Sequence, residues 1–135
     1  MKTLVLFYSF SGKTKAIASS KAQELDADVV EVKEVKHRNA FQAYTVGCYQ
    51  AMKQKKPGIQ PLGADLGAYE KIVVAMPIWA GSPAPAFNSV VGLLPPGQQL
   101  ALIMVSGSGN SNREKAVEYV KAHGCEVLEY FDIKA

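Results

Sequence analysis

The sequence predicts an α/β fold, a doubly wound parallel sheet of five strands with helices on both faces. Short apolar runs alternate along the 135 residues with longer segments in which apolar residues recur every three or four positions. Alternating strand and helix patterns of this kind are typical of parallel sheets. The first strand run is apolar nearly throughout, which indicates a central strand buried on both faces. A hydrophobic content of 48% is enough for one core, so we expect a single domain over residues 1–135.

The first half of the chain contains two predicted strands and two predicted helices. Residues 1–8 form the first strand, and a helical pattern with one polar face follows it and ends near Leu25. Residues 28–32 form a second, more exposed strand. Residues 38–56 have helical spacing again, ended by a Pro-Gly pair. Residues 59–70 contain glycine and proline without a sustained period, so we expect a surface connection there.

The second helix carries a stripe of residues at helical spacing, of which Tyr44 and Met52 are interpreted as packing residues. The stripe consists of Phe41, Tyr44, Thr45, Cys48, Ala51 and Met52. The neighbouring Tyr49 is also interpreted as a packing residue, and Gly47 is a weak point in the helix. His37 and Arg38, which follow the second strand, either rim a site as charge partners or are solvated, as loop residues more commonly are.

The second half of the chain repeats the alternation. Its elements are a strand at 71–76, a turn at 77–82, a helix at 83–94, a strand at 98–105, a helix at 111–122 and a strand at 125–130. Prolines early in the helix at 83–94 suit a first turn, where a missing N–H costs little. Right-handed crossovers place the strand-to-helix loops at one sheet edge, where ligands of such folds bind. The loops at 9–14, 76–82 and 106–110 therefore define the candidate site.

The first of these loops has the composition of a phosphate site. It combines three hydroxyls, a glycine that lets the backbone come close, and one cation: Ser9, Ser11, Thr14, Gly12 and Lys13. A Rossmann turn needs more glycines, and a Walker A loop needs a glycine where Phe7 stands, so dinucleotides and nucleoside triphosphates fit less well. Hydroxyl residues are also favoured at helix starts for local reasons. Considered together with the other two loops, this first loop favours the binding of a terminal phosphate.

The three loops together resemble those of a flavodoxin-type FMN-binding domain. The resemblance rests on Ser9-x-Ser11-Gly12-x-Thr14 after the first strand, Pro77-x-Trp79-Ala80-Gly81 after the third, and a small-residue loop after the fourth. It spans about the whole chain in element order. It implies a sheet ordered 2-1-3-4-5 with the flavin across the ends of strands one, three and four.

The resemblance also implies which residues contact the cofactor. The phosphate ligands are Ser9, Ser11, Gly12, Lys13 and Thr14. The loop beside the flavin ring is Pro77, Ile78, Trp79, Ala80 and Gly81, in which Trp79 either stacks on the ring or anchors the turn. The loop on the other side of the ring is Ser106, Gly107, Ser108, Gly109 and Asn110. No catalytic side chain and no metal site is predicted.

The sequence departs from carrier flavodoxins in three ways. The third loop has no aromatic residue, so one ring face is expected to be open, which favours reaction with a small substrate. The sequence pI is near 8.8, whereas carrier flavodoxins are typically acidic. The chain ends just after the fifth strand, without the family's final helix, so we expect a homodimer or displaced segments to cover that sheet face.

Composition narrows the classes of function. A net charge of +3 without a dense basic stripe argues against nucleic acid, and no apolar run is long enough to cross a membrane. The two cysteines form no C-x-x-C pair, which favours a reducing cytoplasm. We expect an FMN-binding protein that passes electrons to a redox partner protein or a small acceptor. The alternatives are an FMN-dependent NAD(P)H reductase of a quinone or similar acceptor, and a non-redox phosphate-ligand-binding domain.

Overall fold

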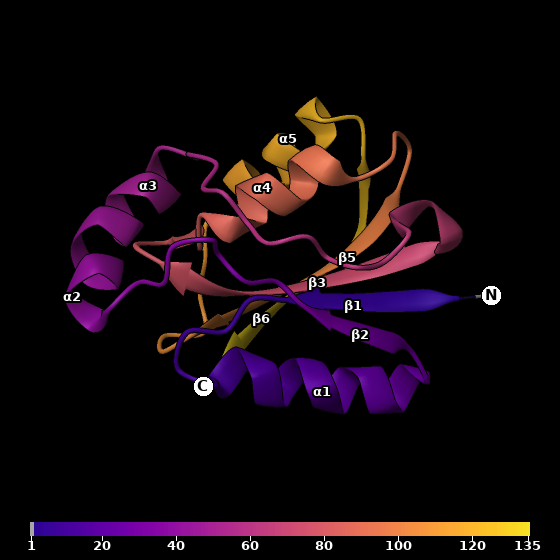
Figure 1. Cartoon of the computed structure of the whole chain (residues 1–135), viewed down its shortest axis with the longest axis horizontal. Helices are drawn as coiled ribbons and strands as arrows, with labels where there is room; N and C mark the ends of the chain where they lie inside the picture. The colour runs from indigo at the N-terminus through magenta and orange to yellow at the C-terminus, as the bar shows by residue number, and fades with distance from the viewer. Residues whose placement is uncertain (1) are drawn as a thin grey trace.

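The computed structural model describes residues 2–135 and contains one central sheet (Figure 1). Its parallel strands follow the order β2-β1-β3-β5-β6. These strands are β1 (Thr3–Phe7), β2 (Asp28–Glu31), β3 (Lys71–Trp79), β5 (Gln99–Ser106) and β6 (Glu126–Lys134). The short β4 (Ser82–Pro83) pairs antiparallel with the end of β3 and lies off this path. With β4 set apart, the predicted order of five parallel strands is confirmed.

Helices cover both faces of the sheet. The helix α1 (Lys13–Leu25) packs on one face, and α4 (Ala86–Leu93) and α5 (Arg113–Ala122) pack on the other (Figure 1). Alternate side chains of each central strand enter two separate cores, one beneath α4 and α5 and one beneath α1. Burial on both faces explains why these strands read as continuous apolar runs.

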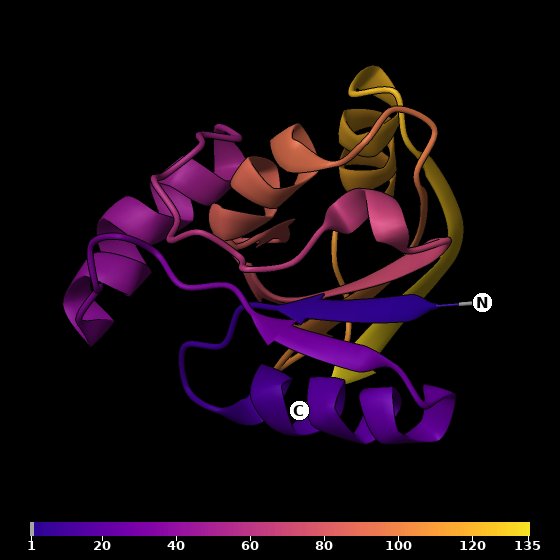
Figure 2. The same ribbon diagram turned by 45° about the vertical axis from the view of Figure 1, so that its right-hand side comes forward.

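A further helical segment stands apart from both layers. It runs through residues 40–52 as α2 (Ala40–Gln42), the short π-helix η1 (Ala43–Gly47) and α3 (Cys48–Met52). We call it the 40–52 segment. Figures 1 and 2 show it beyond the ends of β1 and β3 rather than over the sheet. Its buried residues are the small ones, Ala43, Gly47 and Ala51, whereas Tyr44, Tyr49 and Met52 are exposed. The expectation that these three larger side chains pack in the core is therefore wrong.

Three predicted boundaries differ from the structure. Residues 77–79 continue β3 instead of forming a turn, because the chain reverses within Ala80 and Gly81 and pairs β4 back on β3. Pro83 consequently lies in β4, and α4 begins at Ala86. The last strand continues beyond residue 130 to Lys134, paired with β5 throughout. A short η2 (Leu66–Ala68) interrupts the surface connection that precedes β3.

The sheet face beneath α1 is less open than its single helix implies. Among the described residues, α1 is the one helix on that face, yet Ala101, Ile103 and Val105 of β5 are buried within the single chain. Phe131 of β6 remains exposed and lies beneath the ammonium group of Lys21, 5.5 Å from its ring centroid. A homodimer through this face stays a prediction. Within residues 2–135, no helix combines the length and apolar composition that a bilayer crossing requires.

Candidate functional site

The structure brings the three predicted loops together at the carboxyl ends of β1, β3 and β5. The rings of Phe10 in the first loop and Trp79 in the second meet edge to face, with centroids 5.9 Å apart. Directly after the third loop, the Asn112 amide donates to the carbonyl of Gly81 at 2.8 Å. Side chains and backbone from three distant parts of the sequence thus border one edge of the sheet.

The first loop ends in an open helix N-terminus. Gly12 has φ 96°, a conformation that L-residues rarely adopt, and its amide donates to Ser9 Oγ at 3.0 Å. The first helical hydrogen bond runs from Ala16 to the carbonyl of Gly12. The amides of residues 13–15 precede that bond, so they have no helical acceptor and point out of the helix start.

The side chains of this loop complete a donor set for an anion. Thr14 is 2% exposed, yet no hydrogen bond within residues 2–135 involves its hydroxyl or that of Ser11. No fully buried side-chain polar atom in the described chain lacks a partner, so the Thr14 hydroxyl reaches the surface at the loop. Lys13 is exposed and belongs to none of the ion pairs among these residues. Free hydroxyls, free amides and a cation within one short loop suit a phosphate group.

The second loop is a tight hairpin. Ala80 and Gly81 have φ values of 53° and 83°, and Trp79 pairs with Ser82 across them. Positive φ at both central residues is the signature of a type I′ turn, which suits the right-handed twist of a hairpin. Ile78 faces Pro83 in the same pairing, and the amide of residue 84 donates to the carbonyl of Pro77 at 2.9 Å. The predicted residues of this loop therefore form a rigid tip at the end of β3.

Trp79 is held from several sides. Tyr8 and Phe10 each contact it edge to face at 5.9 Å between ring centroids. The guanidinium carbon of Arg38 lies 5.8 Å from the Trp79 ring centroid. Gly47 packs so closely that a Cβ atom there would stand 2.8 Å from Trp79 Cζ3. The ring therefore anchors the hairpin to the 40–52 segment, and its side chain is only half-buried.

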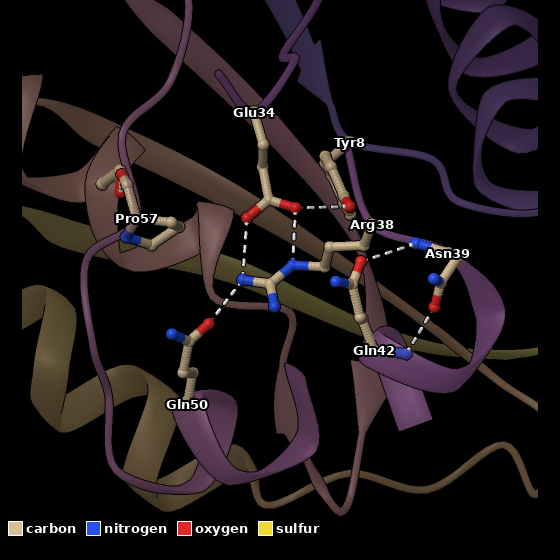
Figure 3. Close-up of polar contacts among 8 residues, drawn as sticks. Tyr8, Glu34, Arg38, Asn39, Gln42, Gln50 and Pro57 are labelled. Carbon is tan, nitrogen blue, oxygen red and sulfur yellow. Dashed lines mark hydrogen bonds and ion pairs between the residues drawn. The ribbon is translucent and has the colours of Figure 1, made fainter. Parts of the chain in front are cut away.

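A buried ion-pair network beside Trp79 was missed by sequence reasoning. Figure 3 shows Glu34 accepting from the Tyr8 hydroxyl at 2.7 Å and from two nitrogens of Arg38 at 2.8 and 3.0 Å. Arg38 also donates to Gln50 of α3. The side chains of Glu34 and Arg38 are only 5% and 10% exposed. Burial raises the pKa of Tyr8 well above its ordinary value, and its hydrogen bond to Glu34 adds to this.

Arg38 is therefore a packing and anchoring residue rather than a solvated one. Its spacing of four residues from Glu34 was the available sequence signal. Outside a predicted helix, however, that spacing does not indicate a pair. His37 is exposed, as loop residues commonly are.

The serine hydroxyls of the third loop form hydrogen bonds within the loop itself. Ser106 Oγ accepts from the Gly109 amide at 2.9 Å and donates to the carbonyl of Asn110 at 3.3 Å. Ser108 Oγ accepts from the Asn110 amide at 3.2 Å. Gly109 has φ 78°, and Gly107 has open space where a side chain would stand. This loop therefore presents mainly backbone and small residues to the site, in contrast to the first loop.

Solved structures provide a parallel for this arrangement. A flavoprotein of Lactobacillus acidophilus NCFM in complex with FMN matches with a TM-score of 0.77 at 25% identity, over 96% of this chain and 91% of that chain. A Bacteroides uniformis ATCC 8492 protein provisionally assigned as a flavoprotein matches with a TM-score of 0.80 at 22% identity, over 96% and 87%. A flavodoxin from the domain Archaea matches with a TM-score of 0.58 at 18% identity, over 99% and 85%. The chain has the flavodoxin-like fold.

The flavodoxin-like fold confirms the fold class that the sequence predicts. The FMN in the Lactobacillus complex agrees with the predicted cofactor. No protein-family model and no curated protein matches the chain.

The candidate site has a further cation that sequence reasoning missed. Lys115 of α5 donates to Ser82 Oγ of the hairpin at 3.2 Å and to the carbonyl of Met52 at 2.5 Å. It therefore ties α5, the second loop and the 40–52 segment together. Its position two residues into a helix gives no indication of that role in the sequence.

Proposed function

We propose that this flavodoxin-like protein binds FMN non-covalently and passes electrons through it. The observation that carries the proposal is the free donor set at residues 9–14, placed beside an aromatic residue at the ligand edge of the sheet. The Lactobacillus flavoprotein that holds FMN has the same fold at 25% identity. When bound, FMN supplies the reversible uptake and release of electrons.

The residues of the chain have distinct proposed roles. Ser11, Thr14 and the free amides of α1 bind the phosphate, and Lys13 adds a positive charge to the helix dipole. The Trp79 hairpin and the third loop border the ring. Because Ala80 and Gly81 fix the hairpin tip, its backbone is preorganised for contact with a planar ligand.

Titration of the flavin-free protein with FMN and with riboflavin tests the proposal. Ser11→Ala and Thr14→Ala should each weaken FMN binding about tenfold to hundredfold, since each removes a hydrogen bond to a charged group. Riboflavin lacks the phosphate, so its affinity should hardly change. Ser20→Ala, at an exposed position of the same helix, is the matched control. Equal losses for both ligands would contradict the phosphate assignment, and no flavin binding at all would leave the non-redox alternative.

A second candidate is an FMN-dependent reductase of a quinone or similar small acceptor. Residues 106–112 contain no aromatic ring, and the third loop has open space at Gly107. This favours access of a small acceptor from that side. Steady turnover of NAD(P)H with a quinone by the FMN-loaded protein would support the reductase. FMN binding without turnover would support the carrier.

A further inference from the structure

The 40–52 segment exposes its largest side chains at the ligand end of the sheet. Phe41 and Tyr44 are 75% and 80% exposed, and Val46, Tyr49 and Met52 are about half exposed. We call these five residues the aromatic helix face. Large exposed apolar side chains gathered in one short segment often mark a binding surface.

Unpaired positive charge flanks the aromatic helix face on both sides in the sequence. Residues 33–60 contain five lysines and Arg38 but one acid, Glu34, whereas the whole chain has a net charge of only +3. Glu34 already neutralises Arg38. The five lysines are exposed, and none forms an ion pair with another residue of 2–135: Lys33, Lys36, Lys53, Lys55 and Lys56. Residues 40–52 themselves carry no charge, so lysines flank an uncharged aromatic centre.

This pattern has the anatomy of a protein–protein interface. Such interfaces have a centre enriched in aromatic residues and methionine and depleted of charge, with a polar rim around it. A lysine rim complements an acidic partner and steers it during association. A second copy of this chain would bring the same positive rim against itself. Helices that lie in membrane surfaces carry Lys or Arg along their own polar face, and the 40–52 segment has none.

We propose that the aromatic helix face docks a protein with an acidic surface. The segment adjoins the candidate flavin site, because Gly47 packs on Trp79 and Lys115 joins Met52 to the hairpin. A docked partner would therefore lie close to that site. That this partner exchanges electrons with the flavin rests on the proposed function; the docking itself does not.

Binding of a strongly acidic ferredoxin to the full FMN-loaded chain at low ionic strength tests the proposal. Lys53→Glu with Lys55→Glu should raise the Kd about tenfold, because two attractions at the rim become repulsions. Lys2→Glu with Lys121→Glu makes the same charge change at exposed positions away from the face and should alter the Kd less than about twofold. Tyr44→Ser removes an aromatic side chain that is 80% exposed and should raise the Kd at least about fivefold.

Several outcomes would overturn the proposal. They are failure to bind the ferredoxin, equal loss in both double variants, or tighter binding of a basic cytochrome c. Tyr44-dependent dimerisation in sedimentation would assign the face to a second copy. Tyr44-dependent binding to phosphatidylglycerol vesicles, without ferredoxin binding, would assign it to a membrane. FMN affinity is measured for the unsubstituted chain and for every variant. If the unsubstituted chain does not bind FMN, the proposed function alone is contradicted, whereas FMN binding without docking contradicts this inference alone.

Discussion

Substituting Gly47 with alanine probes how the 40–52 segment holds the candidate site. A Cβ atom at this position would stand 2.8 Å from Trp79 Cζ3 and 3.1 Å from Cε3. Carbon atoms are comfortable at roughly 3.5–4.0 Å, so the new atom is about 0.7 Å too close to the ring. Tyr8 and Phe10 contact the same ring edge to face and limit its movement. We expect the segment or the ring to shift.

The magnitude follows from two opposing effects. Overpacking of a well-packed site costs about 1–3 kcal/mol. Replacing a helical glycine by alanine contributes about 1 kcal/mol in the opposite direction. The net change in the free energy of unfolding should therefore be a destabilisation of up to about 2 kcal/mol. Gly92→Ala in α4 is the matched control, because its Cβ meets only the flexible end of Lys56 at 3.4 Å.

Urea unfolding followed by fluorescence measures both effects at once. Trp79 is the single tryptophan, so its emission reports on the contact itself. Gly47→Ala should shift the native emission and lower the free energy of unfolding, whereas Gly92→Ala should leave the emission unchanged and raise stability by about 1 kcal/mol. If both variants were stabilised alike with unchanged emission, the close contact of Gly47 with Trp79 would not constrain the site.

Three further predictions concern the surroundings of Trp79. Arg38→Met leaves Glu34 buried without its positively charged partner and should lower the free energy of unfolding in urea by about 3–5 kcal/mol. Adding Glu34→Gln should recover much of this loss, and no recovery would contradict the pairing. Because the pKa of Tyr8 is raised in the folded protein, the tyrosine contributes its full stability below its ordinary pKa of 10.0. Above that pH the free energy of unfolding should fall by about 1.4 kcal/mol per pH unit. In Tyr8→Phe this decrease, followed in a profile of stability against pH, should be smaller. Ala80→Gly relieves a positive φ and should stabilise by about 0.5–1 kcal/mol, measured by thermal unfolding, unless the hairpin tip relaxes.

The sequence predicts the sheet well because the burial of a strand is reflected in its local composition. The buried strands are apolar runs, and the anion loop stands at the junction of a strand and a helix. The hairpin at Ala80 was harder to predict, since Pro77 and Pro83 resemble turn residues. In the structure Pro77 instead continues β3 beside Val105, and Pro83 pairs with Ile78 across the two-residue hairpin. The end of β6 was also missed, because Asp132 interrupts the apolar pattern on an exposed edge strand.

The anchoring of the site could not be predicted, because its contacts join residues far apart in the sequence. Tyr8 and Glu34 are 26 residues apart, and nothing local indicates their hydrogen bond. In a helical pattern Gly47 indicates only weakness, whereas in the fold it allows Trp79 to approach the backbone. Such close approaches depend on the tertiary arrangement, which a single sequence does not show.

The position of the 40–52 segment explains why its large side chains are exposed and its small residues are buried. Over the sheet, its large side chains would form the packing face that their spacing suggests. Beyond the strand ends the segment instead meets Trp79, where only Gly47 and its small neighbours fit, so the aromatic side chains turn outward. A pocket of about 600 Å³ lies beside the segment, lined in part by Lys36, Val46 and Pro57. The position of the 40–52 segment thus holds the Trp79 hairpin in place and leaves an uncharged aromatic surface beside it. Both features should therefore respond to changes at Gly47.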